Sequence, residues 1–567
     1  MIHTIPCFRP VLMLMALLSW LVPVQAGSEH ADLVLRGGKI VTVDADQPEV
    51  SGMAVREGRI LALGTGEEMD AFVGPRTRVI ELAGLTAIPG LIEGHGHFLG
   101  MGLAQMELNL MHTKSWDEVV KIVAAAVAKA QPGQLISGRG WHQEKWNQAP
   151  EPNIEGLPSH AALSAVSPDN PVVLRHASGH ASAANKKAMD MAGIDAETPD
   201  PEGGEIVRDR SGRPIGVFRE TASRLLAPAY ENAEPLDVRR MAELAQAEAF
   251  SKGITSFQDA GISFDDADLY RELIDAGSLR LRMWVMIRSS NADLAENLAA
   301  QRVTGYGGER LTVGGIKKSI DGALGSHGAW LLEPYKDLPS SAGLNTVSVK
   351  EVVEAGKLAI EHDYQLCIHA IGDRANREVL DIFEAAYKAN PDKTDLRWRV
   401  EHAQHLHPAD IPRFGQLGVI ASMQGVHCTS DAPWVEPRLG EVRAESGAYV
   451  WRRLLDTGAV VSNGTDAPVE DVNPLASFYA SVCRRTGSGE VFYGSQSMTR
   501  AEALESYTLS AAYAAFEEKL KGSLELGKLA DITILSRDIM TVPEEEILGT
   551  EVRYTIVGGE VVYEKTK

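Results

Sequence analysis

Two histidines one residue apart, His95 and His97, end an apolar run in residues 89–97 (PGLIEGHGH). Side chains at positions i and i+2 of a strand point to the same face, so a strand ending here would project both imidazoles in one direction. Two converging imidazoles suit a divalent metal such as zinc. Two unrelated histidines in a Gly-rich turn are the alternative, so the pair indicates a metal site only if further ligands accompany it.

Candidate ligands recur at the ends of other apolar, strand-like runs. His369 and His402 end two of these runs, and Asp466 lies two residues beyond the end of a third. An earlier run carries the adjacent lysines Lys317 and Lys318. A lone strand-end histidine is usually structural, but the carboxyl ends of parallel barrel strands meet at one face, where active sites form. The ordered recurrence therefore predicts one site built from several strands.

The middle of the chain alternates strand-like runs with amphipathic helical stretches, which is typical of parallel βα units. The predicted strands cover residues 87–97, 254–258, 281–287, 313–320, 365–369, 397–402, 419–424 and 459–464. Eight such units predict an α/β fold, a (β/α)8 TIM barrel. A doubly wound open sheet is the structural alternative.

The two ends of the chain and one long gap lie outside this repeat. Residues 27–86 and 520–567 contain short strands separated by glycine, which predicts one small β-sandwich domain built from both termini around a barrel at 87–519. The first two barrel strands are separated by far more chain than a helix and its loops need, so we expect an inserted subdomain at 100–249. It leaves from the carboxyl end of strand one and should roof the pocket.

Composition limits the class of partner. The chain has 567 residues, of which 44% are hydrophobic and 23% charged, as in ordinary globular proteins. The formal net charge of −22 argues against nucleic acid and against an anionic membrane surface as partners. Cys367, Cys428 and Cys483 are too few for a disulfide framework in so long a chain, so an ordinary core must provide stability.

The N-terminal residues have the order of a secretory signal peptide. Arg9 precedes a short apolar run at 11–22, and small residues follow up to Gly27. This order predicts a signal peptide over residues 1–26, hence a secreted or periplasmic protein with no stable membrane contact after cleavage. An uncleaved anchor is the alternative.

Taken together, six motifs resemble those of the amidohydrolase superfamily, in the amidohydrolase-3 branch that includes N-substituted formamide deformylases. They lie at 89–98 (PGLIEGHGHF), 316–329 (IKKSIDGALGSHGA), 369–376 (HAIGDRAN), 401–404 (EHAQ), 464–469 (GTDAPV) and 522–531 (GSLELGKLAD). The likeness extends over essentially the whole chain after the predicted signal peptide. The motifs are specific as a set, although no single one is.

The resemblance implies a role for each candidate ligand. His95 and His97 would bind one divalent metal, zinc in the first place, together with Asp466. His369 and His402 would bind a second metal, and the ligand set permits one or two per chain.

A lysine carboxylated by carbon dioxide would bridge the metals, because carboxylation turns an ammonium into an oxygen donor. Lys317 lies four residues before Asp321, the spacing of the branch, and is favoured over the adjacent Lys318.

The resemblance also implies a reaction, hydrolysis of a C–N bond in an amide-like substrate such as an N-formyl or N-acyl compound. A metal lowers the pKa of its water to ~7, and the resulting hydroxide attacks the carbonyl while Asp466 serves as general base and then acid. Deaminases of the superfamily carry a glutamate three residues after the strand-five histidine, where this chain has Gly372. A deaminase and a catalytically silent ligand-binding protein on the same barrel are the alternatives.

Three further residues are predicted to contact a small-molecule substrate. His180 lies in the insertion and resembles a pocket-facing stretch of the branch. His427 follows the seventh strand, where it would touch substrate or stabilise an oxyanion. Trp141 would wall an apolar pocket, with core packing as its alternative. The sequence specifies no particular substrate and permits a homo-oligomer without indicating one.

Overall fold

The structure is a computed structural model that describes residues 30–231 and 233–566. The predicted signal peptide, residues 1–26, lies outside the described residues. Within the described ranges, no helix combines the length and apolar character needed to cross a membrane.

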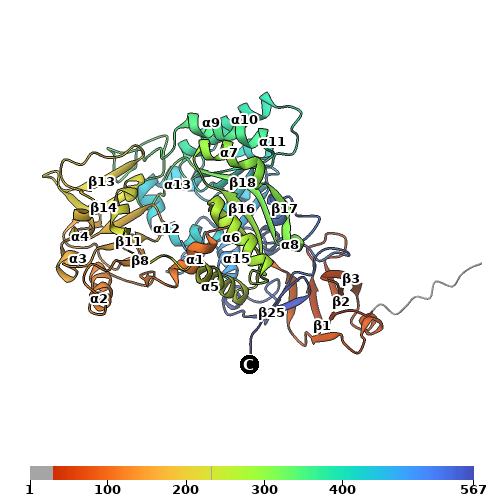
Figure 1. The fold of residues 1–567 in the computed structure, drawn as a ribbon. Coiled ribbons are helices and arrows are strands. Elements are labelled where there is room, and N and C mark those ends of the chain that lie inside the picture. Colours follow the sequence, from red (N-terminus) through yellow and green to blue (C-terminus); the bar gives the residue numbers. More distant parts are fainter. Residues whose placement is uncertain (1–29, 232, 567) are drawn as a thin grey trace, which may run out of the picture.

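Eight parallel strands wind around a barrel at the centre of the molecule (Figure 1). In pairing order they are β6 (Leu91–Gly96), β15 (Ile254–Ile262), β16 (Arg282–Ile287), β18 (Leu311–Ser319), β19 (Gln365–Ala370), β20 (Arg399–His402), β21 (Ile420–Gln424) and β22 (Val461–Gly464). Just beyond the last and first strands, the Asp466 amide donates to the His95 carbonyl and the His97 amide donates to the Ala467 carbonyl, both at 2.7 Å. This nearly closed ring confirms the predicted (β/α)8 barrel and excludes the open sheet.

Helices cover the outside of the barrel. In α10 (Asp373–Ala389), Val379, Leu380 and Phe383 recur at helical spacing and are fully buried against the strands. Because each unit brings the carboxyl end of its strand to the same rim, side chains that follow the strands share that rim. The other helices near the barrel are α5 (Val238–Ser251), α6 (Phe264–Asp275), α7 (Asn291–Gln301), α8 (Tyr306–Glu309), α9 (Val349–Glu361), α11 (Ile411–Leu417), α12 (Gly425–Leu439), α13 (Glu441–Gly447), α14 (Trp451–Leu455), α15 (Pro474–Cys483), α16 (Arg500–Ser506) and α17 (Leu509–Ala514).

Strands from both ends of the chain form a second sheet, in the order β25-β24-β23-β5-β1-β2-β3 with β4 beside β1. All eight belong to one hydrogen-bonded sheet, and a two-layer sandwich stays a prediction. We call this element the terminal sheet. Its strands are β1 (Leu33–Val41), β2 (Glu49–Arg56), β3 (Arg59–Gly64), β4 (Arg78–Glu81), β5 (Thr86–Pro89), β23 (Ile532–Leu535), β24 (Val552–Val557) and β25 (Glu560–Glu564), with helix α18 (Glu544–Ile547) between β23 and β24.

The predicted first barrel strand, residues 87–97, is divided between the two sheets. Strand β5 pairs with β1 and β23 of the terminal sheet, and only β6 joins the barrel. Gly90 lies between β5 and β6, and a Cβ at this position would come within 2.2 Å of Thr255 Oγ1. The chain therefore passes straight from one sheet into the other at a glycine, without a turn that the sequence pattern could reveal.

The predicted insertion is built around a six-stranded sheet and lies on the side of the barrel opposite to β1–β3 (Figure 1). It has its own apolar core, which includes Trp141, Leu174 and Val217. Helix α1 packs against α5, so the chain leaves the barrel after α1 and returns to it at α5. The elements are α1 (Phe98–Ala104), β7 (Leu108–Asn109), α2 (Trp116–Val127), β8 (Ile136–Trp141), β9 (Asn153–Ile154), β10 (Leu157–Pro158), α3 (Ala161–Val166), β11 (Val172–His176), β12 (Ala181–Ala184), α4 (Lys186–Met191), β13 (Gly204–Arg208) and β14 (Pro214–Glu220).

Candidate metal centre and active site

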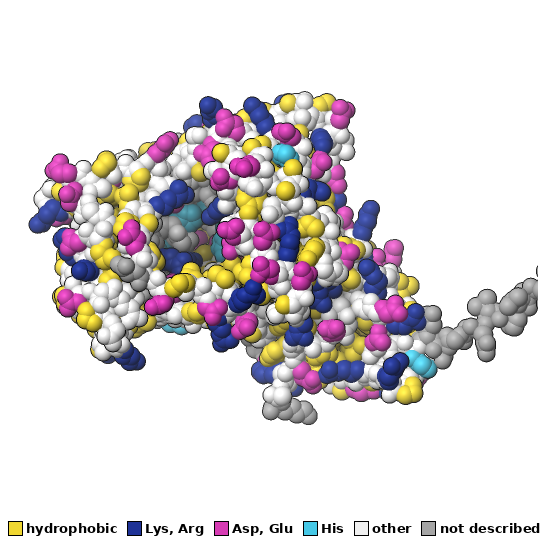
Figure 2. Space-filling view, in the orientation of Figure 1, with side chains coloured by type: hydrophobic (Ala, Val, Ile, Leu, Met, Phe, Trp, Pro, Cys, Tyr) yellow, Lys and Arg dark blue, Asp and Glu magenta, His cyan; other side chains and the backbone are white. Residues whose placement is uncertain are grey.

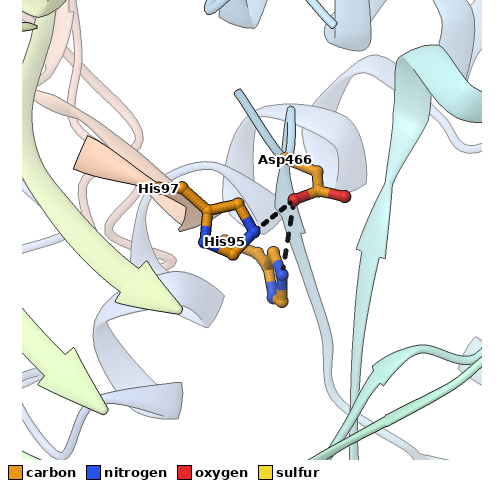
Figure 3. Close-up of side chains that lie close together, drawn as sticks. All are labelled: His95, His97 and Asp466. Carbon is orange, nitrogen blue, oxygen red and sulfur yellow. Dashed lines mark ion pairs between the residues drawn. The ribbon is translucent and has the colours of Figure 1, made fainter. Parts of the chain in front are cut away.

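Three predicted ligands meet where β22 closes on β6 (Figure 3). Asp466 Oδ1 lies 3.1 Å from His97 Nε2 and 3.6 Å from His95 Nε2. The His95 side chain is fully buried, whereas that of His97 is 33% exposed, so the group is open on the His97 side. Two imidazoles and one carboxylate whose ligand atoms lie within 4.8 Å of one another form a set that zinc accepts.

His402 and His369 stand beside this group, with their ring centroids 4.5 Å apart. Ligand atoms of His402, His427 and Asp466 lie within 4.8 Å of one another. His369 Nε2 instead lies 3.4 Å from Asp321 Oδ1. The structure therefore brings His427, predicted as a substrate contact, into the group around His402. The Asp321 carboxylate accepts three backbone N–H groups. Its position means that His369 Nε2 faces Asp321 and not Asp466.

Of the two adjacent lysines, Lys317 points into the site. Successive side chains of β18 face opposite sides: Lys317 Nζ lies 3.4 Å from His95 Nε2, while Lys318 Nζ donates to the Ser289 carbonyl at 2.8 Å and lies 3.5 Å from Glu351. Burial lowers the pKa of Lys317 to about 8. Among the described residues, no carboxylate lies within 4.0 Å of Lys317 Nζ. A buried ammonium without a counter-ion is unfavourable.

Hydrogen bonds fix which ring nitrogens face the site. His95 Nδ1 donates to Glu401 Oε2, because a carboxylate can only accept, and His95 Nε2 keeps its lone pair. His402 Nδ1 donates in the same way to Gln424 Oε1 at 2.7 Å, and the Gln424 amide is oriented by its own N–H bond to the Ser422 carbonyl at 3.2 Å. Both Nε2 atoms are thus available to bind a metal, and a partner on the second nitrogen is typical of metal-binding histidines.

Two buried glutamates hold these ligands in place, and neither was assigned a role from the sequence. Glu401 Oε1 lies 2.7 Å from Arg399 Nε, with both side chains fully buried. Burial opposes ionisation of Glu401, but Arg399 and His95 outweigh it and hold the pKa of Glu401 below its ordinary value. Glu93 accepts from the Thr465 amide at 2.6 Å and from the Thr465 hydroxyl at 3.1 Å, and burial raises its pKa to about 8. Glu93 lies two residues before His95, so both side chains face the same side of the strand. This spacing is the sequence feature that could have identified Glu93 as part of the site.

Two of the candidate ligands have a backbone conformation that is rare outside glycine. Asp466 has φ +57° and His402 has φ +79°, in a region that costs a residue with a Cβ about 1–3 kcal/mol. At Asp466 the conformation is held by the hydrogen bond from its amide to the His95 carbonyl. Strained residues of this kind cluster at functional sites.

A cavity between the barrel rim and the insertion opens onto the ligands. His180 reaches it from the insertion: its Nδ1 lies 2.7 Å from Glu220 Oε2, and its ring centroid is 4.9 Å from that of His369. His427 reaches it from the barrel, with Nδ1 3.0 Å from Gln404 Nε2. Both predicted substrate contacts therefore lie at the cavity. Its lining includes His142, Lys145, Ser178, His180, Leu324, His369, His402, Gln404, His427, Asp431, Trp434, Asp466 and Glu470.

Trp141, the third predicted substrate contact, does not reach the cavity. Its ring is fully buried in the core of the insertion and stacks on Trp146, and its Nε1 donates to the Leu174 carbonyl at 2.9 Å. The next residue, His142, lines the cavity in its place. Side chains at the end of β8 alternate between the core of the insertion and the barrel, so only one of Trp141 and His142 can face the cavity. Trp141 is the one that packs in the core, which was the alternative interpretation of this residue.

Glu401→Gln is expected to weaken zinc binding by roughly 10- to 100-fold, the usual effect of losing a carboxylate partner of a ligating histidine. The glutamine amide no longer supplies the negative charge that favours proton donation by His95 Nδ1. Competition with a chromophoric chelator measures the zinc dissociation constant, and Glu296→Gln, at an exposed position on α7, is the matched control. Zinc affinity within twofold of the unmodified protein would show that Glu401 does not tune His95.

Comparisons with known proteins identify the family of the chain. Residues 78–563 match the model of the Amidohydrolase family, Amidohydro_3. The chain is 35% identical to Protein LONG AFTER FAR-RED 3 of Arabidopsis thaliana over 94% of this chain and 92% of that protein. It is 29% identical to N-substituted formamide deformylase of Arthrobacter pascens over 95% of this chain and 99% of that enzyme.

Among solved structures, an uncharacterized metal-dependent hydrolase from Pyrococcus furiosus superposes with a TM-score of 0.68 at 27% identity, over 90% of this chain and all of that one. The family model spans the barrel, the insertion and the strands of the terminal sheet from β4 onward. The chain belongs to the amidohydrolase family, in its amidohydrolase-3 branch.

Proposed function

We propose that this protein, a metal-dependent hydrolase, cleaves the C–N bond of an amide-like substrate such as an N-formyl or N-acyl amine. The observation that carries the proposal is the meeting of His95, His97 and Asp466 at the barrel rim beneath a roofed cavity. The similarity to N-substituted formamide deformylase supports the bond class.

The donor set fits a divalent metal ion. Among the described residues, Asp466 Oδ1 is a buried carboxylate oxygen without a hydrogen-bond partner, although the Nε2 atoms of His95 and His97 face it. Imidazole nitrogens and carboxylate oxygens are typical zinc ligands, and an ion would satisfy an oxygen that the protein alone leaves unpaired. When bound, it would supply Lewis-acid activation of water and of the substrate carbonyl.

The residues divide into two groups of ligands. The first ion would be held by His95, His97 and Asp466, and a second by His369 and His402. Lys317, once carboxylated, would contribute an oxygen donor between them. Carboxylation also removes the unpaired buried ammonium of Lys317, which supports this residue over Lys318.

The side chains of the chain then have defined tasks in hydrolysis. Asp466 takes a proton from water as the water oxygen bonds to the carbonyl carbon. It delivers that proton to the nitrogen as the C–N bond breaks, which gives a carboxylic acid and an amine. His427, whose Nδ1 faces the Gln404 Nε2 donor, would present its Nε2–H to the carbonyl oxygen. His180, held by Glu220, would position the substrate.

A hydrolysis screen of the zinc-loaded protein tests the proposal. N-formyl, N-acyl, cyclic imide and carbamate compounds are each incubated with the protein, and amine release is measured before and after removal of the metal by a chelator. We expect release from at least one N-formyl or N-acyl compound, lost with the metal and restored by zinc. Aminopurines are incubated in parallel, and ammonia release from them without amine release from any other compound would favour the deaminase. Binding of these compounds without turnover would favour the silent ligand-binding protein.

A further inference from the structure

The cavity beside His97 has a basic wall, and the proposed hydrolysis assigns no task to its arginines. Figure 2 shows a hollow between the insertion and the barrel, with Lys and Arg side chains on its walls and histidines inside it. The part next to the ligands measures about 220 Å³, which is room for several non-hydrogen atoms. Its lining includes His95, His97, Arg139, Arg175, Ser178, Arg288, Lys317, Ser319 and Asp466.

Two of these arginines have no acidic partner. Among the described residues, no carboxylate lies within 4.0 Å of the guanidinium of Arg139 or Arg288, whereas Arg175 lies 2.8 Å from Glu107. Within residues 30–231 and 233–566, the hydrogen bonds of Arg139 go to the carbonyls of Ala177 at 2.8 Å and Pro468 at 3.4 Å. A guanidinium carries five N–H donors, so most of this hydrogen-bonding capacity is left for a ligand.

Arg288 is exposed within the cavity. Its Nη2 donates to Ser319 Oγ at 3.2 Å. Desolvation lowers the pKa of Arg288, and it lowers that of Arg139 to about 10. In a chain with 77 acidic against 55 basic residues, two guanidinium groups without a carboxylate partner make this recess locally positive, which favours an anionic ligand.

The two arginines reach the cavity from different elements. Arg288 directly follows β16, whose Ile287 is in register with Ile316 of β18, so Arg288 lies beside Lys317 at the barrel rim. Arg139 belongs to β8 of the insertion, in the roof. An anionic group held between rim and roof would therefore lie within reach of Asp466, and a guanidinium pairs with a planar carboxylate through two parallel hydrogen bonds.

We propose that the substrate of this site is an amide that carries a carboxylate, and that Arg288 and Arg139 bind this carboxylate. The assignment rests on the proposed amide hydrolysis and names its substrate class. The arginines determine specificity, whereas the metal ligands and Asp466 carry the reaction.

Matched pairs of substrates test the assignment. N-formyl and N-acetyl amino acids are compared with the N-formyl and N-acetyl amino acid amides of the same side chain, in which an uncharged carboxamide replaces the carboxylate. We expect the acid to be the better substrate of each pair by kcat/KM. Arg288→Gln and Arg139→Gln are each expected to reduce the preference for the acid by roughly 10- to 100-fold, the usual effect of losing a charge-assisted hydrogen bond.

Two controls separate this role from a structural one. Arg76→Gln removes the same charge from an exposed position just before β4 of the terminal sheet and should keep the preference unchanged. Zinc per chain is measured in every variant. Loss of zinc in Arg288→Gln would overturn the proposal, because Arg288 would then hold the carboxylated Lys317 and not the substrate. Equal rates on acid and amide in the unmodified protein would also overturn it, although the proposed hydrolysis would stand.

Ligand binding gives a readout that does not depend on turnover. Calorimetry compares benzoate, benzamide and phenylphosphonate on the zinc-loaded protein and on Arg288→Gln. Benzoate should bind at least tenfold more tightly than benzamide, and Arg288→Gln should abolish this difference. Tighter binding of phenylphosphonate than of benzoate would overturn the choice of a carboxylate, and benzoate binding unaffected in Arg288→Gln would place the anion on the metal. Arginine-dependent benzoate binding without any amide turnover would contradict the proposed hydrolysis but retain the anion site.

Discussion

Asp466→Asn is expected to lower kcat/KM by about 10⁴-fold, the upper range for loss of a positioned general base. Asparagine keeps the shape of the side chain but cannot take a proton from water, and it offers the metal a weaker, uncharged oxygen. Folding should be preserved, because asparagine adopts the left-handed conformation of residue 466 (φ +57°) more readily than most residues. Steady-state kinetics on the substrate found in the screen, with zinc measured per chain, provide the test.

Asp471→Asn is the matched control for this change. Asp471 also follows β22, but its side chain is 65% exposed and its ion-pair contact is Lys252 at 3.4 Å. Its substitution should leave kcat/KM within twofold. Hydrolysis by Asp466→Asn at the rate of the unmodified protein would rule out the proposed base, and fewer than one zinc per chain in the reconstituted, unmodified protein would rule out the metal centre.

Lys317→Ala is expected to abolish hydrolysis, with partial recovery in formate, acetate or propionate. The substitution removes the proposed bridging oxygen donor and leaves a hole beside His95 Nε2, the atom from which Lys317 Nζ is 3.4 Å away. A short carboxylate fits such a hole and returns the oxygen donors that the carboxylated lysine would provide. The measurements are kcat/KM against carboxylate concentration and zinc per chain.

Lys318→Ala serves as the control because it is the neighbouring residue of the same type. Lys318 Nζ contacts the Ser289 carbonyl and Glu351 and not the histidines, so activity should be largely retained. Proteins prepared with ¹³C-bicarbonate give a second readout: a carbamate carbon signal should be present in Lys318→Ala and absent in Lys317→Ala. The reverse pattern in both experiments would show that the modified lysine is residue 318.

The sequence predicts the barrel well because each barrel strand is marked by a pattern of neighbouring residues. Each barrel strand is a short apolar run with helices around it, and the runs predicted at 254–258 and 365–369 correspond to β15 and β19. The predicted first strand was wrong in its first residues, which form β5 of the terminal sheet. An apolar run does not reveal which sheet its backbone hydrogen bonds join, since that depends on β1 and β23, far away in the sequence.

By itself, the sequence determined the residue types at the strand ends. Because the carboxyl ends of all strands of a parallel barrel lie at one face, these residue types were enough to predict that His95, His97 and Asp466 share one rim. Tertiary structure alone decided the direction of individual side chains. Lys317 faces the site and Trp141 is turned into the core of the insertion, because the packing of distant segments chooses which face of a strand is covered.

Charge balance was also settled only by tertiary structure. The sequence does not distinguish Arg139, Arg175 and Arg288 by charge pairing. In the part of the chain that the structure describes, Arg175 alone of the three has a carboxylate nearby, that of Glu107. A pairing of this kind depends on distances between residues of different elements, which no local pattern encodes. For this reason the sequence indicates the chemistry at the barrel rim, and the contact between barrel and insertion decides what that rim can bind.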